Sequence, residues 1–198
     1  MKKPFILTSW DDGTIFDMRM ADLLYKYNIP GIFYIPSNTM LSDEQIKNIS
    51  DFHGIGGHTV NHPDDMKKLS YEDQFAEIKN NKDWLEGVIG RRANGFCYPK
   101  GKGDETTIKA IKKAGYREAR RVGWGNKEFP KDMFNIVPTA FAHPDKTKFG
   151  GKSWYDYAMD QLNDEYFHLW GHSHEIEKYN MWHDVDQFFK VLKNHYKL

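Results

Sequence analysis

The first organised stretch of the chain is Phe5-Ile6-Leu7-Thr8-Ser9-Trp10-Asp11-Asp12-Gly13, an apolar run that ends in two adjacent carboxylates and a glycine. A short apolar run of this kind predicts a buried β-strand over residues 5–10. Residues 17–27 carry apolar side chains at helical spacing, which predicts an amphipathic helix soon after the strand. A buried strand followed by such a helix is the repeating unit of parallel α/β sheets.

The alternation of strand and helix continues to the end of the chain. Further strands are predicted at 32–35, 54–58, 95–98, 116–122, 135–139 and 166–170. Further helices are predicted at 42–52, 70–89, 106–114 and 153–162, and a closing helix carries an apolar stripe from Val185 to Tyr196. This pattern predicts a parallel sheet with helices outside it, either closed into a barrel or doubly wound.

Length and composition favour a single domain over residues 1–198. With 198 residues, a second independent core would leave each half near the small end of the domain range. Lysine plus arginine (28) balance aspartate plus glutamate (28), so no overall field attracts nucleic acid or an anionic membrane. Cys97 is the one cysteine, which is too few for a disulfide within the chain or for a thiolate zinc site.

The N-terminal residues contain no apolar segment long enough for a signal peptide or a membrane span. We therefore expect a soluble chain, cytoplasmic as written, with neither nucleic acid nor a membrane as partner. A sequence trimmed of its export signal would look the same. The sequence does not fix the oligomeric state.

Asp11 and Asp12 follow the first predicted strand directly. The carboxyl ends of the strands are the usual place of catalysis in parallel α/β folds. Of two adjacent carboxylates at such a position, one can bind a metal ion while the other accepts a proton. The alternative is a simple turn, in which both carboxylates bond nearby backbone N–H groups.

His58 and His62 also follow a predicted strand. Their four-residue spacing lets both imidazoles converge on one ion if the segment forms a helical turn. Two histidines and one carboxylate leave positions open for water and substrate, as in catalytic zinc sites. The alternative is two ordinary histidines in a polar loop, but the combination with Asp11 and Asp12 favours the metal site.

Four motifs together resemble those of the polysaccharide deacetylase family, also called the NodB-homology family or carbohydrate esterase family four. They are Ser9-Trp10-Asp11-Asp12-Gly13, His58-Thr59-x-x-His62-Pro63, Phe96-Cys97-Tyr98-Pro99-Lys100-Gly101 and Leu169-x-x-His172. The resemblance extends from residue 5 to about residue 175. Residues 168–175 further resemble the gellan-lyase-like branch of that family.

The resemblance implies a fold, an activity and roles for individual residues. The fold would be an incomplete (β/α) barrel of about seven parallel strands with outer helices. Asp12, His58 and His62 would bind one divalent metal ion, commonly zinc. Asp11 would be the general base, His172 the general acid, and the backbone N–H of Lys100 would bind the oxyanion, with Tyr98 and Trp170 beside the substrate.

Two positions depart from the family pattern. The third motif usually begins with an arginine that pairs with the base, and Cys97 stands there instead. Arg120 and Arg121 are the candidates to replace its charge, and the branch resemblance favours Arg120; the alternative is a solvated basic cluster. Lys100 stands where an aromatic residue is common, so that stacking on the substrate would be lost at this position.

Three tryptophans, Trp10, Trp124 and Trp170, are candidate walls for a sugar ring, and Trp170 is favoured because it lies near His172. His174 competes with His172, because residues two apart on a strand share a face. The expected function is metal-dependent removal of an N-acetyl group from an amino sugar in a carbohydrate. The alternatives are hydrolysis of another C–N bond, in a cyclic amide or ureide, and an inactive sugar-binding domain.

Overall fold

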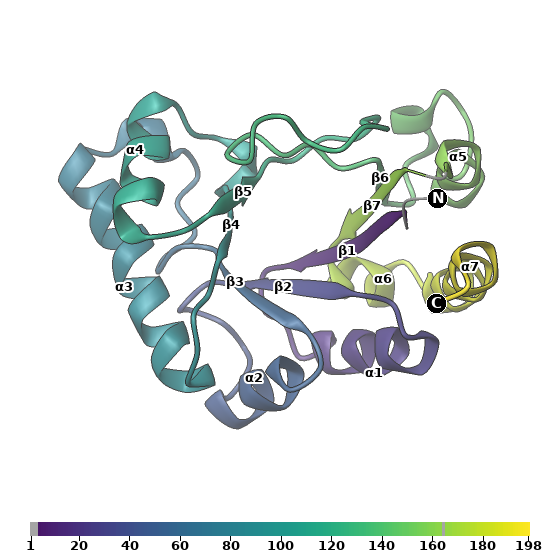
Figure 1. Ribbon diagram of the computed structural model, residues 1–198, viewed down its shortest axis with the longest axis horizontal. Helices are drawn as coiled ribbons and strands as arrows, with labels where there is room; N and C mark the ends of the chain where they lie inside the picture. The colour runs from purple at the N-terminus through teal and green to yellow at the C-terminus, as the bar shows by residue number, and fades with distance from the viewer. Residues whose placement is uncertain (1–3, 164) are drawn as a thin grey trace.

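Seven parallel strands form one sheet in the computed structural model, which describes residues 4–163 and 165–198. The strands are β1 (Phe5–Asp11), β2 (Gly31–Ile35), β3 (Gly54–Gly57), β4 (Gly95–Cys97), β5 (Glu118–Arg120), β6 (Ala140–Ala142) and β7 (Tyr166–Gly171). Their order is β5-β4-β3-β2-β1-β7-β6, so β1 lies in the middle. The sheet curls into a half-barrel with helices outside it (Figure 1), which confirms the predicted incomplete barrel.

The helices follow the strands in the predicted alternation. They are α1 (Asp17–Tyr27), α2 (Asp43–Ser50), α3 (Tyr71–Ile89), α4 (Glu105–Ala114), α5 (Trp154–Gln161), α6 (Ser173–Lys178) and α7 (Trp182–Tyr196), with short 3₁₀ turns η1 (Met66–Lys68), η2 (Pro99–Gly101) and η3 (Lys146–Phe149). The predicted capping box is present at α2, where Ser42 and Gln45 each accept a backbone N–H of the other. Ser70 likewise caps α3, and Gly115 ends α4 in the left-handed conformation.

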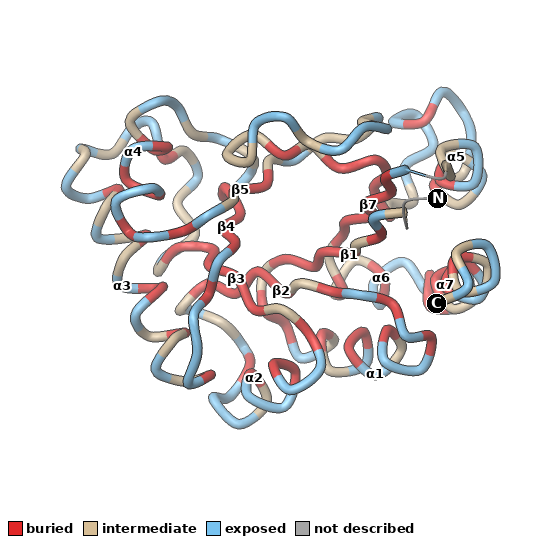
Figure 2. Tube along the Cα trace, in the orientation of Figure 1, coloured by how far each residue is buried: buried red, intermediate tan, exposed pale blue. Residues whose placement is uncertain are grey.

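The apolar core lies between the sheet and the helices. The inward sides of the helices and most of the strands are buried, whereas the outer sides of the helices are exposed (Figure 2). One cluster of apolar side chains joins β1, β2 and β7 to α1, α2 and α7, and a second joins β4 and β5 to α3 and α4. Helices held in this way fix the strand ends, where the candidate residues lie.

The sheet stays open between β5 and β6, and a loop spans this gap. Ile136 makes an isolated parallel bridge with Arg120, and the backbone of Ala119 bonds to Met133 and Ile136. The predicted strand at 135–139 is therefore wrong, and the strand of the sheet begins only at Ala140. Pro138 explains the difference, since it has no N–H to donate to a ladder.

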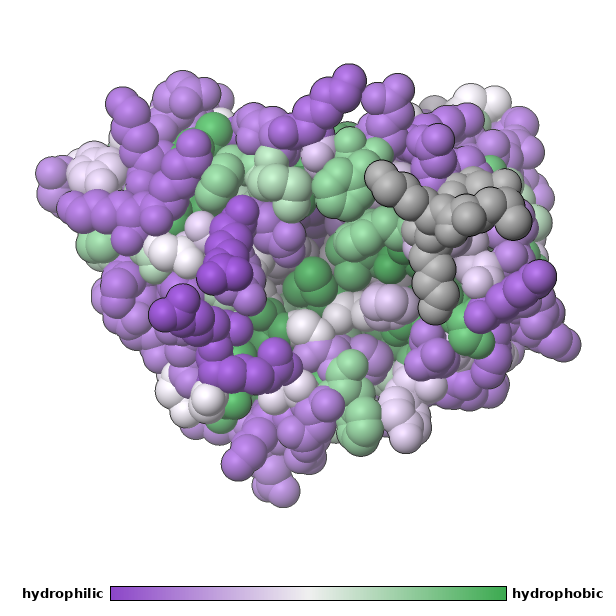
Figure 3. All heavy atoms as spheres, viewed as in Figure 1, coloured by the Kyte–Doolittle hydropathy of each residue, from purple (hydrophilic) through white to green (hydrophobic). Residues whose placement is uncertain are grey.

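The surface is mostly hydrophilic, and apolar residues gather around the hollow of the sheet in the view of Figure 3. Within the described part of the chain, none of the helices is both long enough and apolar enough to cross a membrane.

Candidate active site

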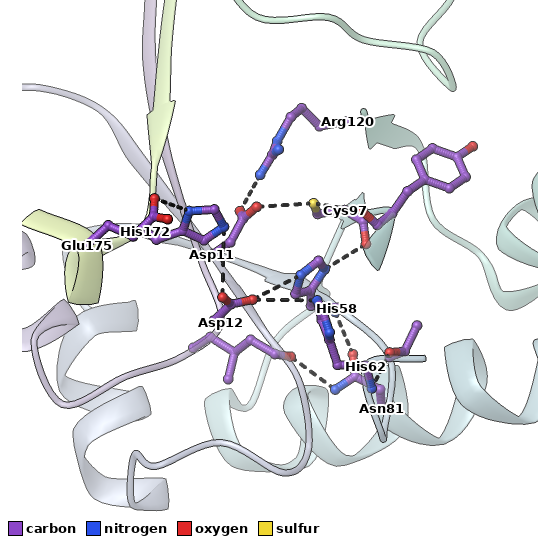
Figure 4. Close-up of polar contacts among 12 residues, drawn as sticks. Asp11, Asp12, His58, His62, Asn81, Cys97, Arg120, His172 and Glu175 are labelled. Carbon is purple, nitrogen blue, oxygen red and sulfur yellow. Dashed lines mark hydrogen bonds and ion pairs between the residues drawn. The ribbon is translucent and has the colours of Figure 1, made fainter. Parts of the chain in front are cut away.

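The candidate residues meet at the carboxyl ends of the parallel strands. Asp11 is the last residue of β1 and Arg120 the last of β5, while His58 directly follows β3. His172 directly follows β7 and begins the turn into α6. Residues that are far apart in the sequence thus face one another across the end of the half-barrel (Figure 4).

Asp12, His58 and His62, which we call the cation site, have ligand atoms that all lie within 4.8 Å of one another. Oδ1 of Asp12 is 3.4 Å from Nε2 of His58 and 3.6 Å from Nε2 of His62. Two ligand atoms that are each about 2.1 Å from a tetrahedral zinc ion lie about 3.4 Å apart. The three side chains therefore fit one divalent cation, with His58 buried and the other two partly open to solvent.

The ring of His58 is oriented by the backbone of β4. Its Nδ1 donates a hydrogen bond of 2.8 Å to the carbonyl of Cys97, which leaves Nε2 facing Asp12. A hydrogen bond to the nitrogen that does not bind metal is the usual way in which proteins fix the tautomer of a histidine ligand. This bond is a second observation that fits a metal site.

The loop that carries both histidines is not the helical turn that we predicted. Thr59 and His62 have φ angles of 71° and 52°, in the left-handed region that residues other than glycine seldom adopt. The hydroxyl of Thr59 accepts the backbone N–H of His62 at 3.0 Å and closes the loop. The imidazoles converge because of this closed loop, with their ring centroids 4.7 Å apart.

Asp11 is buried and paired with a buried arginine. Its Oδ1 accepts a hydrogen bond from Nη2 of Arg120, and the two side chains are almost completely inaccessible. Cys97 and Arg120 are partners in the register of β4 and β5, so the small thiol leaves space for the guanidinium. The structure thus brings a positive charge to Asp11 in place of the arginine missing from position 97.

The indole ring of Trp170 is not accessible to a sugar. Its indole is 3% exposed, with Phe141 stacked on it at 4.1 Å and the Arg120 guanidinium 4.6 Å from the ring centroid. The predicted stacking role is therefore wrong, and Trp170 instead packs against Arg120. Trp10 is completely buried, whereas Trp124 is partly exposed, so Trp124 is the only one of the three tryptophans with an open surface.

The side chain of Tyr98 is also unavailable to substrate. It is buried, its hydroxyl donates to the carbonyl of Phe134, and the Arg121 guanidinium covers the ring at 4.1 Å. Arg121 also donates hydrogen bonds to the carbonyls of Gly101 and Gly103. It therefore stabilises the loop at residues 101–103 and does not contact Asp11.

The backbone of Lys100 has the features of an oxyanion donor. Its φ is 51°, and among the described residues no acceptor bonds its N–H. A non-glycine residue in the left-handed region costs of order 1–3 kcal/mol, and such strain clusters at functional sites. The side chain points elsewhere and pairs with the carboxylate of Asp64.

His172 lies on the other side of Asp12. Its Nε2 is 3.8 Å from Oδ2 of Asp12, and its Nδ1 is 2.9 Å from Oε2 of Glu175. Burial lowers the pKa of His172. The hydrogen bond to Glu175 and the charges of Asp11 and Asp12 raise this pKa by a larger amount, so the net shift is upward. The raised pKa favours the protonated form of the imidazole that faces the site.

His174 is not equivalent to His172. Because α6 begins at Ser173, the two histidines do not lie on a strand as predicted, and their ring centroids are 5.3 Å apart. Burial lowers the pKa of His174, and the neighbouring His172 lowers it further. Among the described residues, no carboxylate lies within bonding distance of its ring, whereas His172 contacts both Glu175 and Asp12.

The structure adds four residues that the sequence did not single out. Glu175 bonds His172, and its other oxygen is 3.8 Å from Nε2 of His143. Glu77 and Asn81 of α3 bond the loop of the cation site. The spacing His172-x-x-Glu175 could have indicated the first pair, because it places both at one helix N-terminus. No spacing connects α3 or His143 to the site.

The comparisons with known proteins agree with this geometry. The model of the polysaccharide deacetylase family matches residues 1–119. The protein named "Putative polysaccharide deacetylase YxkH" of Bacillus subtilis (strain 168) is 28% identical over 127 residues, which make up 59% of this chain and 45% of that protein. The chain therefore spans less than half the length of this relative.

Two solved structures share the fold. A family 4 carbohydrate esterase from Streptomyces lividans, in complex with acetate, has a TM-score of 0.73 at 13% identity, covering 99% of this chain and 91% of that chain. BA3943 of Bacillus anthracis, described as a family pseudoenzyme, has a TM-score of 0.70 at 16% identity, covering 98% and 62%. The family match over more than half of the sequence, on the half-barrel that these structures share, shows that the chain belongs to the polysaccharide deacetylase family.

Proposed function

We propose that this protein is a metal-dependent hydrolase that removes the N-acetyl group of an amino sugar in a poly- or oligosaccharide, with residues 1–198 acting as one catalytic domain. The observation that carries the proposal is the convergence of Asp12, His58 and His62 on one point beside the paired carboxylate Asp11. These three residues would hold the ion, which we expect to be zinc. A divalent cation held there supplies Lewis-acid chemistry, since it acidifies water and polarises an acyl oxygen.

Asp11 is proposed as the general base. Arg120 occupies Oδ1, whereas the one contact of Oδ2 among the described residues is the weak one with the Cys97 thiol at 3.5 Å, so Oδ2 can take a proton from the attacking water. The guanidinium pairs with the negative charge of the carboxylate without competing for that oxygen. Arg120 is thus proposed as the positioning residue of the base.

His172 and Lys100 are proposed for the two remaining tasks. The leaving amine needs a proton, and the imidazole of His172 faces the site with its Nε2 while Glu175 holds Nδ1. The free N–H of Lys100 can donate to the oxygen that becomes negative when the acetyl carbon is attacked. Trp124, with its partly exposed ring, is the candidate surface for the sugar.

The rival function, an inactive sugar-binding domain, was suggested by Cys97. The ion pair between Arg120 and Asp11 supports the enzymatic function instead, because it supplies the charge that Cys97 cannot. Hydrolysis of another C–N bond, in a cyclic amide or ureide, would use the same residues and differ only in the substrate.

The test is release of acetate from N-acetylglucosamine oligomers by the purified, zinc-loaded protein. We expect acetate from the wild-type protein and none from Asp11→Asn, while elemental analysis finds about one equivalent of metal in both. Bound metal without release of acetate would refute the deacetylase proposal. Ring opening of cyclic amides by that same sample would then support the other C–N hydrolase.

A further inference from the structure

The loop of the cation site holds a conformation that its own residues do not favour. Thr59 is β-branched and has a φ of 71°, which is rare for such a side chain, and His62 has a φ of 52°. The loop also carries both imidazoles of the cation site. Contacts from outside must therefore hold it in place if the imidazoles are to stay converged without an ion.

Glu77 of α3 binds the middle of this loop with its whole carboxylate. Oε2 accepts the backbone N–H groups of Val60 at 3.0 Å and Asn61 at 2.8 Å, and Oε1 accepts the side-chain amide of Asn61 at 2.6 Å. A carboxylate that accepts several N–H groups makes strong, charge-assisted hydrogen bonds. Glu77 therefore fixes Val60 and Asn61, two of the three residues between the histidines.

Asn81 lies one turn further along α3 and binds the start of the loop. Its Oδ1 accepts the backbone N–H of His58 at 3.0 Å (Figure 4). Its amide donates to the carbonyl of Ile35 and to the hydroxyl of Ser37, both at 3.0 Å. The completely buried Asn81 thus ties the ends of β2 and β3 together at the cation site.

Residues four apart share one face of a helix, so Glu77 and Asn81 act together on the loop. We infer that Glu77 and Asn81 are positioning residues of the cation site, which set its affinity for a divalent cation by holding the loop of His58 and His62 in place. The inference rests on the proposed function, because it assumes that the cation site binds metal. Glu77 is the sharper test, since its described bonds go only to the loop.

The experiment is calorimetric titration of the metal-stripped full chain with Zn²⁺. Glu77→Ala is expected to weaken Zn²⁺ binding by about 10- to 100-fold, the usual effect of removing a partner that orients a ligand. Glu77→Gln keeps an acceptor oxygen and should lose less. Asp83→Ala is the matched control, because Asp83 is an exposed carboxylate on the same helix whose described ion pair is with Lys79 and not with the loop.

Amide hydrogen exchange gives a readout that does not depend on metal. In the metal-free protein, the N–H groups of Val60 and Asn61 should exchange faster in Glu77→Ala than in the wild type. An affinity equal to that of Asp83→Ala would overturn the inference. Unchanged exchange at Val60 and Asn61 in Glu77→Ala would also overturn it, because Glu77 would then not hold the loop.

The outcomes separate this inference from the proposed function. Wild-type protein that binds Zn²⁺ but releases no acetate refutes the deacetylase and leaves the role of Glu77 intact. Wild-type protein that binds no Zn²⁺ refutes both.

Discussion

The cation site and the wall that faces it are built in different ways. The cation site (Asp12, His58 and His62) comes from two short segments, each directly after a strand, and a closed loop holds both histidines. The opposite wall, which we define as Arg120, His172 and Glu175, comes from β5 and from the turn after β7. β5 is at one edge of the sheet and β7 is next to the other edge, and the curl of the half-barrel brings their carboxyl ends to face each other.

The two regions also differ in how far the match to the family model reaches. The match to the family model ends at residue 119, directly before Arg120, so it includes the cation site and excludes the opposite wall. The cation site can therefore be inferred from local motifs. The wall depends on packing, and there the chain has replaced a missing arginine with one from the next strand.

The largest effect is expected when the carboxylate of the cation site is removed, which tests whether this region binds the metal ion. Asp12→Ala should leave the purified protein without bound metal and lower turnover by at least about 10³-fold, because the ion contributes several kcal/mol to the transition state. Elemental analysis and acetate release measure the two effects. His174→Ala is the control and should keep its metal. Metal retained by Asp12→Ala would refute the cation site as we define it.

Removing Arg120 tests whether the opposite wall supports Asp11. Arg120→Ala leaves the buried carboxylate of Asp11 without a partner and should lower the free energy of unfolding by about 3–5 kcal/mol. Urea denaturation measures this loss, and the exposed Arg117→Ala should show almost none. The variant should still bind metal but turn over slowly. A fully stable, fully active Arg120→Ala would mean that the wall does not support the base.

Much of the fold was predictable because strand and helix patterns differ in period. The buried runs at 5–10 and 166–170, the caps at Ser42 and Ser70, and the final apolar stripe all became the predicted elements. The segment 135–139 failed because its apolar residues resemble a strand, while Pro138 and the bridge at Ile136 make it a closing loop.

The site was predictable to the extent that its residues are neighbours in sequence. Asp12, His58 and His62 were found from spacing and strand ends, although the turn that joins the histidines is not helical. The burial of Tyr98 and Trp170 could not be predicted, because their partners come from distant segments. The roles of Asp11, Arg120 and His172 in catalysis, and of the cation site in binding metal, stay predictions.

Asp17, a buried carboxyl group outside both regions, is expected to make the stability of the metal-free protein depend on pH. It lies at the start of α1, and its Oδ1 accepts the hydroxyl of Ser173 in α6. Burial raises the pKa of Asp17 to about 8, although the hydrogen bonds from Ser173 and the backbone oppose this, and Asp12 and Asp11 add repulsion. The folded protein therefore keeps a proton that the unfolded chain releases near pH 4.

A group whose pKa is raised by folding stabilises the fold below its unfolded pKa and loses that effect as pH rises through the folded pKa. The contribution of Asp17 to the stability of the metal-free wild type should accordingly fall between about pH 4 and pH 8, by about 1 kcal/mol per pH unit. Asp17→Asn should lose this slope in urea titrations at several pH values. Asp22→Asn, an exposed position on the same helix, should keep it, and an unchanged slope in Asp17→Asn would assign the pH dependence elsewhere.

The smallest expected effect concerns the contact between Glu175 and His172 within the wall. Glu175→Gln replaces the carboxylate that holds Nδ1 of His172 with a neutral amide of the same size. It should lower turnover by about 10-fold, because proton donation to the leaving amine depends on the orientation of the imidazole. Metal content and the urea midpoint should stay near those of the wild type, since Glu175 lies outside the cation site and is partly exposed.

The matched control is Glu177→Gln, on the same short helix, whose carboxylate faces Trp182 and Arg19 instead of His172. Equal turnover in the two variants would show that Glu175 does not orient the acid. A loss of metal in Glu175→Gln would contradict the separation of the two regions, because a change in the wall would then alter metal binding at the cation site. A loss confined to turnover supports two regions that divide the work, one holding the ion and the other handling the protons.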